Sequence, residues 1–133
     1  MTGTSNDYYI DYRIEKAYDS FDDAQLLFSN ERWNACVNRL YYSCFYITIA
    51  LMVKNGIETT THDGVRNQLG LRFVKNNLID KHFGKLYSKL FDYRLKGDYG
   101  DLFDFNEALV APLITEVEKY LDTIKTLILA HDI

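Results

Sequence analysis

The stretch of sequence that decides the fold is WNACVNRLYYSCFYITIALMVK, from Trp33 to Lys54, in which most positions are apolar or aromatic. Neither proline nor glycine interrupts it, and it is too long for a typical strand, so it predicts a helix of about six turns. Its apolar residues form two stripes about 100° apart around this helix. One stripe contains Val37, Leu40, Cys44, Ile47 and Leu51, and the other contains Tyr41, Phe45, Ile49 and Met52. A helix that is apolar on several faces must be covered on several faces, so this stretch is expected at the centre of the domain.

The composition favours one all-helical domain. The chain has 133 residues, enough to bury a single core, and 47% of them are hydrophobic, which argues against disorder. One proline and seven glycines provide few turn signals of the kind that separate strands. We therefore predict a disordered tail over residues 1–9 and a single domain over residues 10–133.

Neither a secretory signal nor a membrane span is expected. The first residues lack a charged segment followed by an apolar run, and the apolar stretch from Tyr41 to Val53 is shorter than the roughly 20 residues that cross a bilayer. Cys36 and Cys44 lie eight positions apart, so on one helix they are about 12 Å apart and cannot form a disulfide bond. Free thiols are typical of a cytoplasmic protein. No metal ion and no other cofactor is expected.

One helix is expected before the central one. It begins at Asp11 and ends near Ser29, because its apolar residues recur at a spacing of three and four. Asn30 is expected to cap the central helix at its start. Gly56 is expected to end the central helix as its C-cap.

Three helices are expected after the central one. They are predicted over residues 64–75, 81–95 and 106–130. Thr61 or Asp63 is expected to cap the first of them, and Asp80 the second. Gly97 and Gly100 are expected to bracket a turn before the last helix. The sum is an all-α, five-helix up-and-down bundle.

The net charge of −4 conceals a basic middle between acidic ends. Residues 54–96 carry a net charge of +5, whereas residues 1–23 carry −4 and residues 97–133 carry −6. A basic surface attracts an anionic ligand such as RNA or a nucleotide. The alternative is that the basic segment pairs with the acidic terminal helices of the same chain.

Four short motifs follow one another along the chain. They are Ala35-x3-Arg39-x-Tyr41-Tyr42-x2-Phe45, Thr61-His62-x-Gly64-Val65, Phe73-Val74 and Arg94-x3-Asp98-Tyr99. In this order and spacing, over residues 33–102, they resemble the HEPN superfamily, and most closely its small stand-alone prokaryotic branch. The resemblance implies a helical bundle that forms a homodimer. It also implies a toxin, or an RNA-directed protein, that works with a minimal nucleotidyltransferase as its antitoxin partner.

The resemblance also implies a test for catalysis. Active HEPN ribonucleases are metal-independent and share an R-x4–6-H motif, presented twice in a cleft between two protomers. This chain departs from the motif, because the positions that follow Arg94 at that spacing are Tyr99, Gly100 and Asp101. The missing His would carry the proton transfers, and a tyrosine, with an ordinary pKa of about 10, is a poor base at neutral pH. The departure argues against catalysis at this motif.

Arg94 is the first candidate for binding RNA or nucleotide phosphate, because a guanidinium group binds phosphate with two hydrogen bonds and stays charged. Asp98 is expected to orient Arg94 or Arg39. Tyr99 is expected to stack on a base or to pack at the end of the bundle. The alternative for Arg94 is a salt bridge with Asp98 or Asp92.

Arg39 is a second candidate, because a charge in an apolar helix needs a partner. It shares a helix stripe with Tyr42, and its neighbour Asn38 belongs to the same predicted phosphate-binding network. The alternative for Arg39 is an internal pair with Asp98 or another carboxylate.

His62 lies at the entry of a predicted helix, where backbone N–H groups also point. If folding brings it near Arg94, the pair reproduces in space what the R-x4–6-H motif supplies in sequence. The alternative is that His62 holds its own loop in place.

Three functions remain open from the sequence. The first is an RNA-associated or toxin-like module that acts with a nucleotidyltransferase partner. The second is a metal-independent endoribonuclease that uses Arg94, His62 and Tyr99 in a dimer cleft. The third is a nucleotide-binding or purely structural helical dimer.

Overall fold

The computed structural model describes the backbone of residues 3–59, 61–99 and 104–130, and the side chains of these residues except 3–5, 98 and 99. Five α-helices and one π-helical segment make up most of this part of the chain. They are α1 (Gly3–Ser29), α2 (Trp33–Lys54), α3 (His62–Gln68), η1 (Leu69–Val74), α4 (Lys81–Tyr99) and α5 (Glu107–Ala130). No strand occurs among the described residues, and the predicted all-α, five-helix bundle is confirmed.

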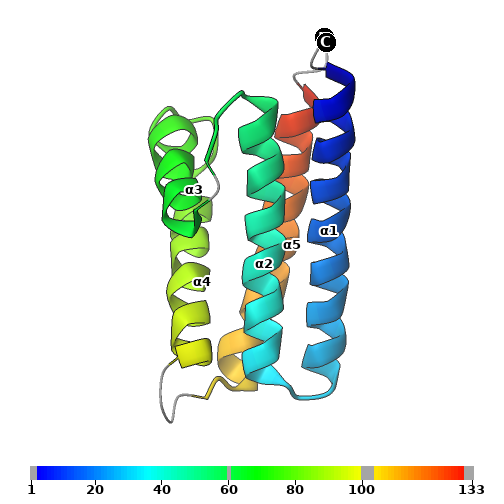
Figure 1. Cartoon of the computed structure of the whole chain (residues 1–133). Coiled ribbons are helices and arrows are strands. Elements are labelled where there is room, and N and C mark those ends of the chain that lie inside the picture. The colour runs from blue at the N-terminus through cyan, green and yellow to red at the C-terminus, as the bar shows by residue number, and fades with distance from the viewer. Residues whose placement is uncertain (1–2, 60, 100–103, 131–133) are drawn as a thin grey trace.

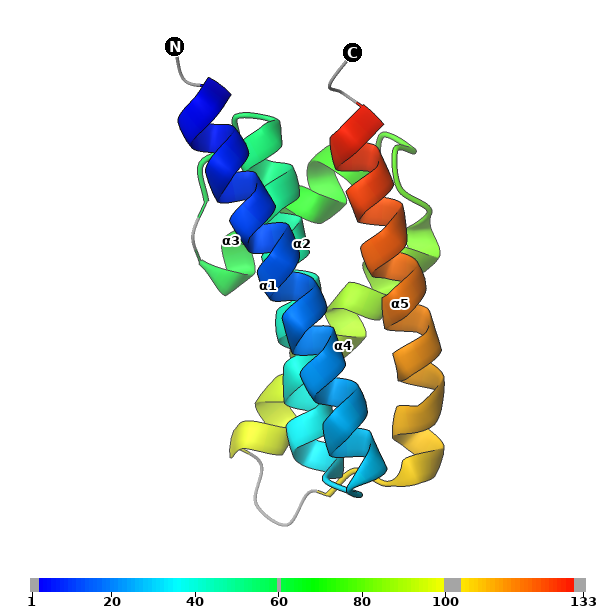
Figure 2. The same ribbon diagram turned by 90° about the vertical axis from the view of Figure 1, so that its right-hand side faces the viewer.

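α2 lies at the centre of the bundle, with the bounds that its sequence predicts. It contacts α1, α3, α4 and α5, and Figure 1 shows it between α1 and α4, with α5 behind it. Thirteen of its residues are buried, and they include every member of the two predicted apolar stripes. Figure 2 shows that α1 begins and α5 ends at the same end of the bundle.

α2 is also long and apolar enough, by length and composition alone, to cross a membrane. No membrane span was expected because the stretch Tyr41–Val53 is too short, but this stretch is only part of the apolar helix Trp33–Lys54. In the folded chain, 67% of the most apolar window of α2 is buried inside the bundle. Such burial is that of a core helix, covered by its neighbours on several faces.

α1 begins at Gly3 rather than at Asp11, so residues 3–9, predicted as a tail, are helical. Ile10 is buried in the core, and Arg13 Nε donates a hydrogen bond to Tyr9 Oη, one turn earlier, at 2.9 Å. The spacing of apolar residues does not predict these extra turns, because their contacts are made by tyrosine and arginine side chains.

Asn30 does not cap α2, contrary to the prediction. Its side-chain Nδ2 donates back to the carbonyl of Leu26 at 2.9 Å, and Arg32 occupies the N-cap position without a side-chain hydrogen bond. The predicted N-caps Thr61 and Asp80 are confirmed, each by a side-chain hydrogen bond. Gly56 was predicted as the C-cap of α2, but Asn55 occupies that position, and Gly56 follows it with a positive φ of 69°.

The helix predicted over residues 64–75 consists of two segments. α3 ends at Gln68, and the backbone then widens into η1. The N–H of Lys75 bonds to the carbonyl of Gly70, five residues earlier, at 2.9 Å. This is the hydrogen-bond pattern of a π-helix, which is rare and has no simple sequence signal.

The turn predicted around Gly97 is wrong, because α4 continues through it to Tyr99. A Cβ atom at Gly97 would lie 3.1 Å from the ring of Phe105. The glycine therefore leaves room for the aromatic side chain that leads into α5. Gly100 lies outside the described residues.

Candidate functional site

Two adjacent tyrosines of α2, Tyr41 and Tyr42, stand at the centre of the candidate site. Tyr41 is completely buried, and its ring packs edge-on against that of Tyr42, with ring centres 5.2 Å apart. Tyr41 also contacts Phe91 of α4 and His62 of α3. Side chains from three helices therefore meet at this tyrosine pair.

Arg94 of α4 lies on these rings. Its guanidinium carbon is 4.8 Å from the ring centre of Tyr41 and 5.9 Å from that of Tyr42, and the residue is only 9% exposed. Nη1 lies 3.5 Å from the hydroxyl of Tyr42, a long hydrogen bond. Among the described residues, Nε has no hydrogen-bond partner. The aromatic faces stabilise the cation, but they do not accept a hydrogen bond from Nε.

The predicted salt bridge between Arg94 and Asp92 is not formed. Within the described side chains the ion pairs are those of Arg66 with Asp63 and of His82 with Asp80, and Arg94 takes part in neither. The other predicted partner, Asp98, has its side chain outside the described residues. Arg94 is thus a buried cation that no described carboxylate neutralises.

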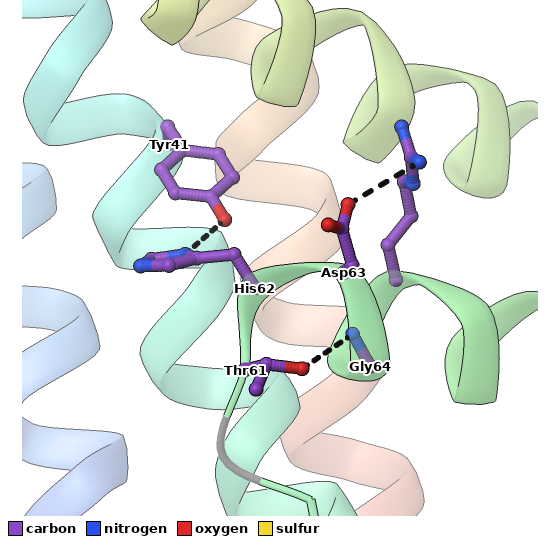
Figure 3. Close-up of polar contacts among 6 residues, drawn as sticks. Tyr41, Thr61, His62, Asp63 and Gly64 are labelled. Carbon is purple, nitrogen blue, oxygen red and sulfur yellow. Dashed lines mark hydrogen bonds and ion pairs between the residues drawn. The ribbon is translucent and has the colours of Figure 1, made fainter.

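His62 reaches the same tyrosines from the start of α3. Its Nδ1 lies 2.7 Å from the hydroxyl of Tyr41, as Figure 3 shows. Its ring stacks on Phe45, with ring centres 4.3 Å apart. The sequence-based hypothesis that folding brings His62 to the neighbourhood of Arg94 is consistent with this geometry, because both side chains lie within 6 Å of the Tyr41 ring centre.

The protonation of this pair follows from its surroundings. Burial, and then the positive charge of Arg94, lower the pKa of His62 below its usual value, so the imidazole is neutral at pH 7. Burial raises the pKa of Tyr41 to about 12, so its hydroxyl keeps its proton. The hydroxyl of Tyr41 and Nδ1 of His62 therefore share one hydrogen bond between two neutral groups, and the imidazole tautomer sets which of the two atoms donates.

The loop before α3 fixes where His62 stands. Thr61 Oγ1 accepts a hydrogen bond from the N–H of Gly64 at 2.9 Å (Figure 3). Thr61 is therefore the N-cap of α3, directly before the first helical residue, His62. A Cβ atom at Gly64 would collide with the side-chain oxygen of Thr59 and would lie 2.7 Å from that of Thr61. The glycine therefore permits the tight turn that presents His62 to Tyr41.

We expect Gly64→Ala to displace this loop and to break the contact between His62 and Tyr41. The expected cost is about 1–3 kcal/mol of unfolding free energy, the usual range for overpacking, measured by urea denaturation. Gly70→Ala is the matched control, because a Cβ atom there would meet nothing within 4 Å. Equal stability of the two variants would contradict the role given to Gly64.

Arg39 and Asn38 form a second, half-buried part of the site. Nε and Nη2 of Arg39 donate to the side-chain oxygen of Asn38 at 3.1 and 2.8 Å. The guanidinium carbon of Arg39 lies 5.1 Å from the ring centre of Tyr42. Its partner among the described side chains is therefore a neutral amide, and Arg39 and Arg94 both lie within 6 Å of the Tyr42 ring centre.

The structure adds side chains that sequence reasoning left out. Tyr41 was assigned to the core, yet it touches both Arg94 and His62. Arg66 of α3 lies with its guanidinium carbon 4.2 Å from the ring centre of Phe91, which Arg94 also approaches. The only sequence signal for Tyr41 was the Tyr-Tyr pair of its motif, and Arg66 had none.

Two predicted site residues, Asp98 and Tyr99, lie at the end of α4. The backbone of Asp98 and Tyr99 forms the last turn of α4, but their side chains lie outside the described residues. Their roles remain predictions. Among the described residues, no group of three or more His, Cys, Asp or Glu side chains could hold a metal ion.

Two ion pairs between described side chains of the basic middle segment are local. Arg66 pairs with Asp63 at 3.6 Å, and His82 lies 2.7 Å from Asp80. Lys54 and Lys96 of this segment have further interactions, so its pairing with the acidic terminal segments stays an alternative to an anionic ligand.

Comparison with known proteins identifies the family. The family model of the HEPN domain matches residues 10–128. The chain belongs to the HEPN family. It is 40% identical over 119 residues to a UPF0332 protein of Thermotoga maritima, and the alignment covers 90% of each chain. The resemblance seen in the four motifs is therefore confirmed.

Two further relatives come from Methanocaldococcus jannaschii, and both are named as candidate toxins. One is 31% identical, over 84% of this chain and 83% of its own. The other is 27% identical, over 90% of this chain and 82% of its own. A toxin-like HEPN domain is accordingly the functional class to which these similarities point.

Proposed function

We propose that this HEPN protein is a toxin-like module that binds single-stranded RNA through a backbone phosphate held at Arg94. The observation that carries the proposal is the burial of this guanidinium group without a described carboxylate partner and with an unpaired Nε. A buried charge is costly unless it is paired. A phosphate group would pair it, with the bidentate geometry that arginine favours.

The neighbouring groups suit the same ligand. His62, which shares the Tyr41 contact with Arg94, adds an imidazole ring that can hydrogen-bond to a phosphate. Arg39 approaches the Tyr42 ring as Arg94 does and adds a further positive charge. A single phosphate, or two successive ones, would therefore meet donors from α2, α3 and α4.

The geometry favours binding over cleavage. A general base must accept a proton, but Nδ1 of His62 is already engaged by the hydroxyl of Tyr41. The alternative, a metal-independent endoribonuclease that uses Arg94, His62 and Tyr99, is supported by one observation, the shared contact of His62 and Arg94 with Tyr41.

We expect the purified protein to bind total RNA in EDTA without cleaving it. Gel electrophoresis of the RNA after incubation, with Arg94→Met and His62→Ala in parallel, measures this directly. Cleavage by the wild type that is lost in both variants would contradict the expectation and establish the endoribonuclease. Cleavage that persists in both would indicate a contaminating nuclease.

The proposal includes a homodimer in the cytoplasm and a nucleotidyltransferase as the antitoxin partner. The names of the two archaeal relatives support the toxin role, and the two buried free thiols, Cys36 and Cys44, suit a reducing compartment. Light scattering tests the dimer. Growth after induction, with and without a co-expressed nucleotidyltransferase, tests the toxin role, and Arg94→Met is the control variant.

A further inference from the structure

A concave site is formed in part by Phe45, the residue on which His62 stacks. A cleft of about 690 Å³ opens between the first half of α1, the second half of α2 and the loop between α2 and α3. Its volume lies within the range of small-molecule sites. The residues that define it here are Tyr9, Arg13, Phe45, Ile49, Val53 and Glu58.

Arg13 at this cleft is surrounded by aromatic rings. Its guanidinium carbon lies 5.2 Å from the ring centre of Tyr9, 5.8 Å from that of Tyr12 and 5.4 Å from that of Tyr46. Tyr9 is 38% exposed and Tyr12 46% exposed. The cleft is thus lined by a part-exposed tyrosine, Tyr9, and by an arginine that packs among aromatic rings, and aromatic and guanidinium groups bind planar rings by stacking.

The side chains that line the cleft indicate the class of ligand that fits it. Phe45, Ile49 and Val53 make one side apolar, whereas Glu58 on the loop supplies a carboxylate. One arginine and one glutamate nearly cancel in charge, so the cleft is not built for a phosphate. A nucleobase suits it, because a base has an apolar face and an edge that carries both hydrogen-bond donors and acceptors.

The cleft is connected to the phosphate site through Phe45 and the loop. Phe45 lines the cleft and stacks on His62, with ring centres 4.3 Å apart. Glu58 lies on the loop before α3, four residues before His62, the first residue of that helix. We propose that the cleft binds an unstacked base of the RNA whose phosphate is held at Arg94, an inference that rests on the function proposed above.

The test compares two probes with the same number of phosphates. One is a short single-stranded RNA labelled with a fluorophore, and the other is an abasic oligonucleotide of equal length, both followed by fluorescence anisotropy. We expect the wild type to bind the RNA at least about 10-fold more tightly, since stacking of one base contributes about 1–3 kcal/mol. Tyr9→Ala should remove most of this preference without weakening binding of the abasic probe.

Tyr8→Ala is the matched control, because Tyr8 is the neighbouring residue, is 80% exposed and does not line the cleft. It should retain the full preference for RNA. Equal affinity of the wild type for the two probes, or equal behaviour of the two tyrosine variants, would overturn the base site. The phosphate site would still be supported in that case if Arg94→Met weakens binding of the abasic probe. Failure of the wild type to bind either probe would overturn both proposals.

A second copy of the chain is the competing occupant of the cleft. In that case Tyr9→Ala would dissociate a dimer, as seen by light scattering, and would change the affinity for both probes equally. This result would also overturn the base site.

Discussion

Replacing Arg94 by methionine is expected to weaken binding of single-stranded RNA by about 30-fold. A hydrogen bond to a charged group contributes about 2 kcal/mol, which corresponds to this factor. Stability should change little, by about 1 kcal/mol or less. The lost attraction of the cation to the tyrosine faces is offset by removal of a buried charge and of an unpaired Nε. Anisotropy titration and urea denaturation measure the two quantities.

Arg72→Met controls for the loss of one positive charge. Arg72 is exposed on η1 and donates to Gln68, away from the tyrosine pair. It should lower RNA affinity only slightly, through the general field of the protein. If Arg94→Met unfolded the protein while Arg72→Met did not, Arg94 would be a structural residue paired with a carboxylate, and the phosphate site would be wrong.

Replacing Tyr41 by alanine is expected to destabilise the protein by about 3–5 kcal/mol, the usual cost of removing a large buried aromatic side chain. The ring is fully buried and contacts α3 and α4 as well as its own helix. RNA binding should be lost with it, because Arg94 and His62 both rest on this side chain.

Tyr41→Phe separates the two roles of the residue. It keeps the ring but removes the hydroxyl that bonds to His62, so the expected loss of stability is only about 1 kcal/mol. The pKa of His62 should change, because the removed hydrogen bond holds the imidazole in its present position and environment. An unchanged His62 pKa, followed by NMR, would show that Tyr41 does not hold this side chain.

The bundle could be predicted from the sequence because its signals are local. The uninterrupted run from Trp33 to Lys54 fixes the bounds of α2, and Gly56 and Thr61 act within a few residues of their own positions. Prediction was wrong where a local signal competes with a distant contact. Gly97 was interpreted as a turn, but it makes room for Phe105 within a continuous helix.

The site could be predicted only in part for the same reason. Arg94 and His62 were recognisable as phosphate-binding residue types, yet their common contact with Tyr41 depends on how α3 and α4 pack on α2. The position of Asp92, two residues before Arg94, made a salt bridge plausible in sequence. In the folded chain the guanidinium group turns to the aromatic rings instead.

The most direct test of the phosphate site is the pKa of His62, measured by NMR titration with and without a short single-stranded RNA, and with His62→Gln to assign the signal. In the free protein this pKa should lie below 6.5. RNA should raise it, because a phosphate bound beside Arg94 favours the imidazolium and screens the positive charge of Arg94. RNA binding that leaves the His62 pKa unchanged would place the RNA elsewhere on the protein and contradict the account.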